Sequence, residues 1–540
     1  MAASIVTPAP LILQPYNKKA PLRIMNPYLK IDQVTRSLVV VDLNKDRMDG
    51  QIAACGLQGI INRSASEKLY VMNTYCFDNL KGGKTQIQIA ERFLDTLFSD
   101  IPAERLAPEQ SNRWPGFMAI LRRFQNVIKG LIIWDPALES ATIEAATTLA
   151  GQTDGLICSP EIAAALEDLN IPVIKDFREE EFKNNIECLD WLLDNCFENC
   201  EKTFAFTWSH MTTDATSWGA ANKDYVIALK LFSYYLDITD ERERLAYERV
   251  LNRYPQGTPI LGWSDEKWSD ELFAKLGYFM VPYISVENLT VHASFPATVV
   301  TQPVPQAVEV VPNGVYIAMF VADGDNLLHS MVYEPDCIMR SKAYGEIPLT
   351  WIINPGLTDL APRLFEWYYQ GLGNQEMAAM LSDGHPFSDR YEAFHQYCDF
   401  CSYYLAKAGM FTLKQMEESE AVAWNVQPYV MNSGYAGTCS KGIGVHDYHM
   451  DDQCFHIGSI KHTDAISIRN RVKSARGKGP LFLNIFCGTA IIDLPELVKD
   501  IAEDLRSGQC QEGVEYFFLR SMDMAATYRS FKGLPVDSHN

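Results

Sequence analysis

The feature that most constrains the fold is the run from Gly314 to Val321, which is continuous, apolar and rich in β-branched and aromatic residues. Such a run is typical of a strand that is buried on both faces of a parallel sheet. Asp323 and Asp325 follow it, separated by a glycine, and Asn326 and His329 come next. In α/β folds, ligands and chemistry sit at the carboxyl ends of strands. This segment is therefore the first candidate site of the chain.

Two carboxylates at one strand end can divide the work of a general acid and a general base, or they can hold a divalent metal ion. In the first case, burial and the neighbouring charge are expected to raise the pKa of one of Asp323 and Asp325. The other then acts as base or nucleophile, while Asn326 and His329 orient the substrate. The alternative is a turn in which Asp323 or Asn326 only caps the next helix.

Segments that predict a strand and then a helix recur along the chain, which favours parallel α/β architecture. The N-terminal strands are expected at 37–43, 68–73, 130–134, 155–158, 172–174, 203–208, 258–263 and 278–282. Helices are expected between them at 50–63, 86–98, 140–150, 160–169, 184–196 and, as one long stretch, 223–254. The C-terminal strands are expected at 314–321, 349–353, 376–381, 427–431, 455–457, 481–486 and 516–519, with helices at 360–370, 390–408, 495–505 and 522–530.

A chain of 540 residues exceeds the size of one hydrophobic core, so several domains are expected. The proline-containing stretch 300–311 marks the main boundary. The predicted fold class is α/β, with several small Rossmann-like N-terminal subdomains and a C-terminal distorted (β/α) barrel. An open doubly wound sheet is the alternative. The expected units are an extended surface arm at 1–34, α/β subdomains at 35–106, 107–178 and 179–300, and a barrel-like catalytic domain at 312–540.

Charge and composition limit the classes of molecule that the protein is expected to bind. The net charge is −21 and no segment is rich in Lys and Arg, which argues against nucleic acid and anionic membrane surfaces as partners. No stretch has the length of a membrane span and the N-terminus lacks a secretory pattern, so we expect a cytoplasmic protein. The 13 cysteines mostly lie in apolar patterns and are expected to be reduced and buried. The expected partner is a small-molecule or carbohydrate substrate.

Two other strand ends in the C-terminal part carry groups suited to a sugar site. Trp351, in the strand at 349–353, offers a ring on which a sugar can stack, and Asn354 stands at the strand exit; a core Trp and a loop Asn are the alternative. Asp383 and His385 flank a glycine after the strand at 376–381. That loop is suited to acid/base chemistry and binding, although a cap for the next helix also accounts for it.

Further candidates come from a histidine-rich segment and from the N-terminal part. The segment 446–462 holds four of the ten histidines, including His446 and His449. With Asp323 and Asp325 these could ligate one divalent ion, the alternative being a solvated loop. Trp263 and Glu266 follow an N-terminal strand as a possible cleft wall and acid, or as part of a helix start. Since glycosidase carboxyls usually lie about 5–10 Å apart, Glu266 or Asp383 could partner one of the first two acids.

With these residues in hand, the chain resembles the bacterial GxGYxYP family, whose members carry the name "putative glycoside hydrolases". The matching segments are 57–63, 262–263 with 265–266, 276–279, 287–292, 322–326 and 351–355. The resemblance implies small N-terminal α/β subdomains and a C-terminal barrel-like domain that bears the active site. At the family signature, here 382–388, only Gly384 is kept, while His385 and Phe387 replace tyrosines and Ser388 replaces the proline. This departure predicts a different substrate or reaction.

The leading interpretation is a hydrolase of a glycoside or glycosylated small molecule that uses carboxylate acid/base chemistry and needs no cofactor. The first alternative is a divalent-metal-dependent enzyme, either a deacetylase or a DxD-type transferase. A tailoring enzyme for a small metabolite is the second. The third is a non-catalytic protein that holds a ligand with Trp351 and His385.

Overall fold

The structure is a computed structural model. It describes 28–73, 86–110, 113–208, 223–264, 269, 272–273, 275–283, 286–297, 299–321, 324, 326–381, 400–401, 403–415, 437–440, 448–450, 455–462, 480–487, 493–507 and 513–533. In these ranges the strands form four sheets, which confirms a mixed α/β chain with parallel sheets. No helix within the same ranges is long and apolar enough to cross a membrane.

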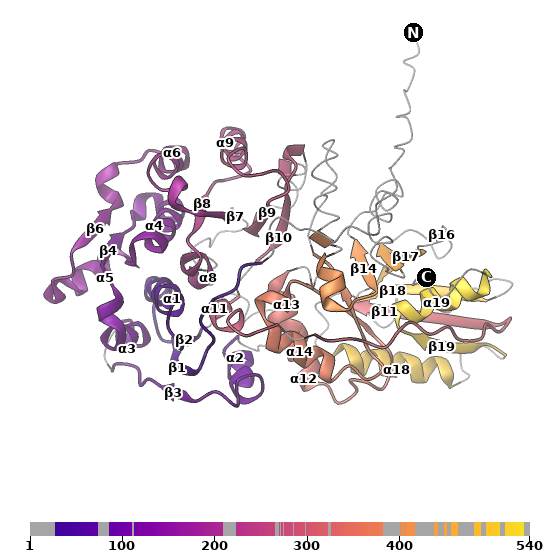
Figure 1. The fold of residues 1–540 in the computed structure, drawn as a ribbon. Coiled ribbons are helices and arrows are strands. Elements are labelled where there is room, and N and C mark those ends of the chain that lie inside the picture. The colour runs from indigo at the N-terminus through magenta and orange to yellow at the C-terminus, as the bar shows by residue number, and fades with distance from the viewer. Residues whose placement is uncertain are drawn as a thin grey trace, which may run out of the picture.

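Three of the sheets belong to the N-terminal half of the chain, drawn in indigo to magenta at one end of the molecule (Figure 1). Their strand orders are β2-β1-β3, β5-β4-β6 and β10-β9-β7-β8, and every pair within them is parallel. The strands are β1 (Ser37–Asp42), β2 (Glu67–Met72), β3 (Ala103–Arg105), β4 (Gly130–Ile133), β5 (Gly155–Cys158), β6 (Val173–Asp176), β7 (Glu201–Trp208), β8 (Leu231–Tyr235), β9 (Pro259–Trp263) and β10 (Phe279–Pro282).

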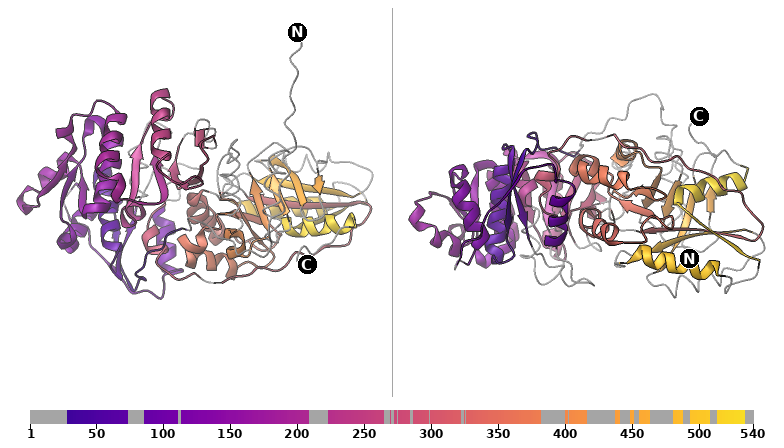
Figure 2. Two further views of the ribbon diagram at one scale, coloured as in Figure 1. Left: turned by 45° about the horizontal axis from the view of Figure 1, so that its top comes forward. Right: turned by 90° about the horizontal axis from the view of Figure 1, so that it is seen from below.

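The fourth sheet lies at the other end of the elongated molecule, in rose to yellow (Figure 2). Its order is β12-β13-β14-β15-β17-β18-β11-β19; β16 pairs with β17 and is its antiparallel member, and β11 also pairs with β12. The strands are β11 (Gly314–Val321), β12 (Thr350–Ile353), β13 (Glu376–Ala379), β14 (Thr412–Gln415), β15 (Gly437–Ser440), β16 (Tyr448–Met450), β17 (Phe455–His462), β18 (Leu481–Cys487) and β19 (Glu515–Leu519). All residues of β11 are buried, as its apolar run predicts.

Helices follow most of the strands. They are α1 (Met48–Asn62), α2 (Gln86–Asp95), α3 (Pro115–Phe124), α4 (Glu139–Thr153), α5 (Pro160–Ala165), α6 (Asn185–Asn195), α8 (Lys223–Ala228), α9 (Glu241–Leu251), α11 (Leu289–His292), α12 (Glu334–Arg340), α13 (Leu357–Leu360), α14 (Pro362–Gln370), α18 (Leu494–Arg506) and α19 (Ser521–Phe531). A π-helical turn, η6 (His329–Tyr333), precedes α12. Several helix starts have the expected chemistry; for example, the Ser159 side chain accepts from the backbone N–H of Ile162.

The long helix predicted at 223–254 is wrong, because β8 divides it into α8 and α9. Lys230 ends the first helix in a left-handed conformation with φ of 57°. The next residues, Leu231 to Tyr235, are all buried and pair with β7. Helical spacing of the flanking apolar residues hid this short aromatic strand in the sequence.

Of the surface arm predicted at 1–34 the structure describes 28–34, where 30 and 32–34 are exposed but two residues are anchored in the core. Tyr28 and Ile31 are buried, 3% and 4% exposed. The Tyr28 ring stacks on Phe204 of β7 at 5.3 Å, and its backbone N–H donates to the Tyr404 hydroxyl at 2.7 Å. Lys30 forms an ion pair with the buried Asp359 at 3.2 Å. This segment therefore packs between the N-terminal units and the C-terminal domain. The other unit boundaries stay predictions, as does the strand at 427–431, which lies outside the described residues.

A buried hydrogen-bond network joins the segment that contains α11 to the first sheet. The Asn288 side chain exchanges two bonds with the backbone of Val71 in β2, each 2.8 Å long. Its Oδ1 also accepts from Gln58 Nε2 of α1 at 2.7 Å. Asn288 adopts a left-handed conformation, φ 60°, which an Asn tolerates better than most residues. One side chain thus ties residues that are 217 and 230 positions apart.

The same network continues through Thr290 into the third sheet unit. Asn62 of α1 donates to Thr290 Oγ1 at 2.8 Å, and Thr290 donates its hydroxyl to Asp224 of α8 at 2.7 Å. The backbone N–H of Thr290 also donates to Asp224 at 2.9 Å. Gln58, Asn62, Asp224, Asn288 and Thr290 are buried, and we call them the α11 network. Buried polar groups of this kind must be satisfied, so the network fixes how its parts dock.

Replacing Asn288 by Ala is expected to lower the free energy of unfolding by about 3 kcal/mol, because the Val71 backbone and Gln58 lose buried partners. Urea unfolding followed by tryptophan fluorescence measures this loss. The matched control is Asn195→Ala at the exposed end of α6, expected to change it by less than about 0.5 kcal/mol. Equal effects of the two changes would contradict the structural role of the network.

Asp224 gives the network a pH dependence. Burial raises the pKa of Asp224 to about 6, from about 3.8, so the folded state holds a proton between about pH 4 and 6 that the unfolded state has released. The stability from this group is therefore complete below about pH 4 and is lost as the pH rises through 6, at on the order of 1 kcal/mol per pH unit. We expect Asp224→Asn to flatten this part of the stability–pH curve, measured by urea unfolding from pH 4 to 7. The exposed Asp500→Asn should leave it unchanged; a curve that keeps its slope in Asp224→Asn would refute the assignment.

Candidate functional site

The carboxyl ends of β11 and β12 come together at one edge of the C-terminal sheet. Phe320 and Val321 of β11 pair with Thr350 and Trp351 of β12. Just beyond, a Cβ built on Gly324 would lie 1.6 Å from the carbonyl oxygen of Ile352. Only glycine allows this approach, so the residue between the two predicted acids contacts the neighbouring strand.

Ser330 holds these two strand exits together. Its hydroxyl donates to the Gly324 carbonyl at 2.6 Å and accepts from the backbone N–H of Asn354 at 3.0 Å. The carbonyl of Ser330 accepts from the Tyr368 hydroxyl at 2.7 Å. Burial raises the pKa of Tyr368 well above its usual value, which keeps this phenol protonated as a donor. Ser330 was not predicted as a site residue; its one signal in the sequence is a lone hydroxyl in an apolar helical stretch.

Asn326 begins the helix that follows. Its side chain accepts from the backbone N–H of Leu328 at 3.0 Å, and its carbonyl accepts from His329 and Ser330. Asn326 therefore acts as a cap, the alternative considered for it. The helix then widens into η6, a π-helical turn of a kind that is frequent at functional sites. His329 lies in this turn with its ring 5.0 Å from that of Tyr333.

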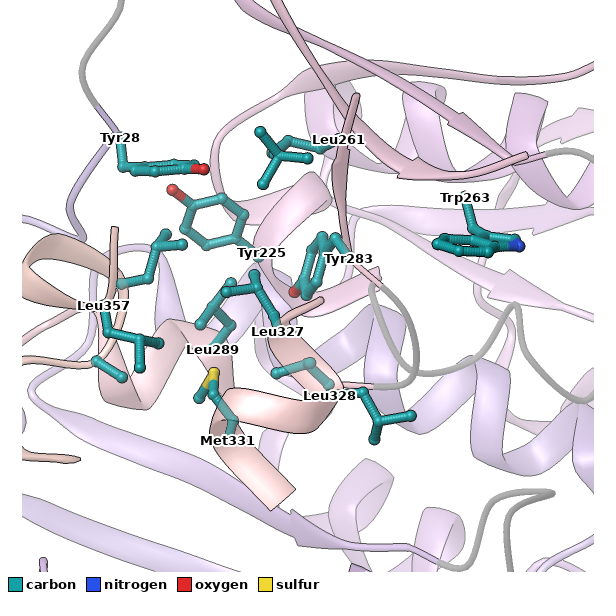
Figure 3. Packing of buried hydrophobic residues seen from close by; sticks show 14 of the residues in the cluster. Tyr28, Tyr225, Leu261, Trp263, Tyr283, Leu289, Leu327, Leu328, Met331 and Leu357 are labelled. Atoms are coloured by element: carbon teal, nitrogen blue, oxygen red, sulfur yellow. The ribbon is translucent and has the colours of Figure 1, made fainter. Parts of the chain in front are cut away.

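The structure places three other predicted binding residues in the interior. Trp351 is 1% exposed and donates its indole N–H to Gln375 at 3.1 Å, so it has no open face for a sugar ring. Asn354 is fully buried and accepts from the backbone N–H of Gly356 at 2.8 Å. Trp263 is buried in β9, 6% exposed, at the edge of the cluster in Figure 3. Trp351 is thus a core residue and Asn354 a loop residue, as the alternative to a sugar site predicted.

The other predicted site residues are Asp323, Asp325, Asp383, His385, Glu266 and His446, and all of them lie outside the described residues. The backbone of His449 lies in β16, opposite His456 of β17. Among the side chains that the structure describes, no three His, Cys, Asp or Glu residues are grouped as a metal site requires. The structure thus brings the backbones of Asn326 and Asn354 together at Ser330, with His329 next to it in the chain.

The helix after Asn326 also contacts the N-terminal units. Figure 3 shows Leu327, Leu328 and Met331 on the side that faces Leu289 of α11 and Tyr283. All of these residues belong to one buried hydrophobic cluster. The helix that starts at the candidate edge of the C-terminal sheet therefore packs directly against the N-terminal units.

Three family models match the chain. They are "GxGYxYP_N second domain" over residues 128–200, "GxGYxYP third domain" over 207–294 and "GxGYxYP putative glycoside hydrolase C-terminal domain" over 313–474. Together they span more than half of the sequence. The chain belongs to the GxGYxYP family, as the sequence resemblance predicted.

Comparison with solved structures shows which known folds this chain resembles. A "putative hydrolase" from Bacteroides thetaiotaomicron is similar at a TM-score of 0.74 and 17% identity, covering 95% of this chain and 99% of that one. At this identity the similarity shows the fold alone. A "putative polysaccharide deacetylase" from Mycobacterium smegmatis reaches a TM-score of 0.31 at 10% identity, covering 44% of this chain and 96% of its own. No curated protein sequence matches the chain.

Gly324→Ala tests the close approach at the site. Its Cβ would overlap the Ile352 carbonyl, so we expect the free energy of unfolding to fall by about 3 kcal/mol. Gly371→Ala is the matched control, because the nearest atom to its Cβ would be 4.0 Å away. Thermal unfolding of both variants measures the difference, and a Gly324→Ala protein as stable as the control would show that the two strand exits are further apart.

Proposed function

We propose that the protein is a carbohydrate-active hydrolase whose chemistry takes place at the carboxyl edge of the C-terminal sheet. The observation that carries this proposal is the convergence of the β11 and β12 exits, fixed by Gly324 and Ser330, around the segment that contains Asp323 and Asp325. Membership of a family whose C-terminal domain bears the name of a glycoside hydrolase agrees with it. Ligand sites in α/β folds lie at such strand ends.

We also infer that the C-terminal sheet forms a distorted barrel. The support is that β11 pairs along one side with β18 and along the other with both β19 and β12. The β19 pairing covers Gly314 to Ala318, and the β12 pairing covers Phe320 and Val321. The strand order runs from β12 through β13, β14, β15, β17 and β18 to β11. The β11–β12 pairing would therefore join the two ends of this row of strands.

In the proposed reaction, one of Asp323 and Asp325 protonates the glycosidic oxygen and the other acts as base or nucleophile. Both flank Gly324, whose carbonyl is held by Ser330, and Asn326 anchors the start of the next helix. Acids that flank a fixed backbone position are suited to preorganised acid/base catalysis. Asp383 or Glu266 remains the candidate for a more distant second carboxyl.

Replacing the acids tests this assignment. We expect Asp323→Asn and Asp325→Asn to lower kcat by about 10²–10⁴-fold on any glycoside that the wild type cleaves in a panel of nitrophenyl glycosides and polysaccharides. Asp500→Asn, on the exposed face of α18, should keep full activity. Full activity in both acid variants would reject the site.

Metal removal separates this reaction from the metal-dependent alternative. Activity should survive dialysis against a chelator, because two carboxylates alone perform the chemistry. Activity that is lost on chelation and restored by a divalent ion would instead assign Asp323 and Asp325 to metal binding.

A further inference from the structure

A small cavity lies where the first unit, the α11 segment and η6 meet. Its volume is about 30 Å³, and its walls include Tyr70 of β2, Phe93 of α2, Glu287, His292, Met331 and Val332. That volume is enough for about two water molecules or two hydroxyl groups. The cavity is only partly enclosed, so a larger molecule can insert one edge into it.

Two polar residues of this cavity, Glu287 and His292, come from the segment that also supplies Asn288 and Thr290 to the α11 network. Asn288 and Thr290 use their side chains in the network, but Glu287 and His292 do not. Among the described residues, Glu287 Oε1 and His292 Nδ1 have no hydrogen-bond partner although both atoms are buried. His292 is 3% exposed, and its ring packs against Phe93 and Phe98 at 5.6 and 5.1 Å. Buried polar atoms without partners are costly, and they call for a bound group that satisfies them.

Burial disfavours the charged form of both groups. Burial, reinforced by the charge of Asp224, raises the pKa of Glu287 well above its usual range. Burial lowers the pKa of His292 to about 3. A protonated carboxyl and a neutral imidazole can each donate and accept a hydrogen bond. Hydroxyls, which also donate and accept, complement the unpartnered atoms of both side chains.

We propose that this cavity binds the vicinal diol of a neutral polyol or sugar, with Glu287 and His292 hydrogen-bonded to the two hydroxyls and the apolar walls against its carbons. The site is separate from the β11–β12 edge and does not depend on the reaction proposed there. Met331 lines the cavity only five residues after Asn326, about 7 Å along the helix axis. A ligand here would therefore touch the helix that starts at the candidate active site.

The test uses the full-length protein with 13C-labelled methionine methyl groups, and the Met331 signal is assigned with Met331→Leu. Glycerol is the probe, and 1-propanol, which has the same carbon chain but one hydroxyl, is the comparison. We expect glycerol to shift the Met331 methyl signal saturably and 1-propanol to leave it in place. The buried Met524 of α19 serves as the internal reference.

Variants then separate hydrogen bonding from shape. Glu287→Leu and His292→Leu should weaken the glycerol response at least tenfold, whereas His292→Gln, which can still donate and accept, should retain it. If a Leu variant fails to fold, the contrast between glycerol and 1-propanol in the wild type still decides. A Met331 signal that ignores glycerol would mean that water alone fills the cavity. An equal response to both alcohols, or one unchanged in folded Leu variants, would also overturn the proposal.

Discussion

The hydrogen bonds of the α11 network are the constraint on which the rest of the structure depends. Asn288 and Thr290 form hydrogen bonds with groups on β2, α1 and α8. The first two elements belong to the unit of the first sheet and α8 to the unit of the third. Arg63 extends the same docking, since its guanidinium donates to the carbonyls of Gly151 and Ile227 at 2.7 Å each. The donors and acceptors of the α11 network are buried, so the units cannot slide without leaving polar groups unsatisfied. The three small N-terminal sheets therefore act as one support for the C-terminal domain.

The N-terminal units contact the helix that starts at the candidate site through hydrophobic packing. Leu289 of α11 and Leu327 after Asn326 belong to one hydrophobic cluster, and the segment at Tyr28 fills the space nearby. At the site itself, the overlap that any Cβ at Gly324 would make fixes the distance between the β11 and β12 exits. Ser330 then links the two exits by hydrogen bonds. The spacing of the two strand exits is thus set by Gly324 and Ser330.

Much of the fold could be predicted because long apolar runs and strand-helix alternation report burial directly. β11, with every residue buried, and α1, with its apolar spacing, are examples. The prediction failed at β8, where five buried residues between two helices have no distinct period, and at Tyr28, whose burial depends on Phe204 far along the chain. Trp351 shows why binding residues are harder to predict than strands. The sequence places an aromatic residue near a strand end, but it does not show whether neighbouring elements bury the ring.

The α11 segment shows a further limit of the sequence. Glu287 to His292 matched a family segment, but no pattern assigned Asn288 to docking and Glu287 to a cavity. Those roles depend on Val71, Gln58 and η6, which are brought there by tertiary packing. Ser330 was missed for the same reason, since its partners Gly324 and Asn354 come from different strand exits.

The most direct test of the central claim is a crystal structure of the Asp325→Asn variant soaked with an oligosaccharide that the wild type cleaves. Our account predicts density for the scissile bond at the carboxyl edge of β11 and β12, within hydrogen-bond distance of Asp323. A sugar bound productively elsewhere, with that edge empty, would contradict it.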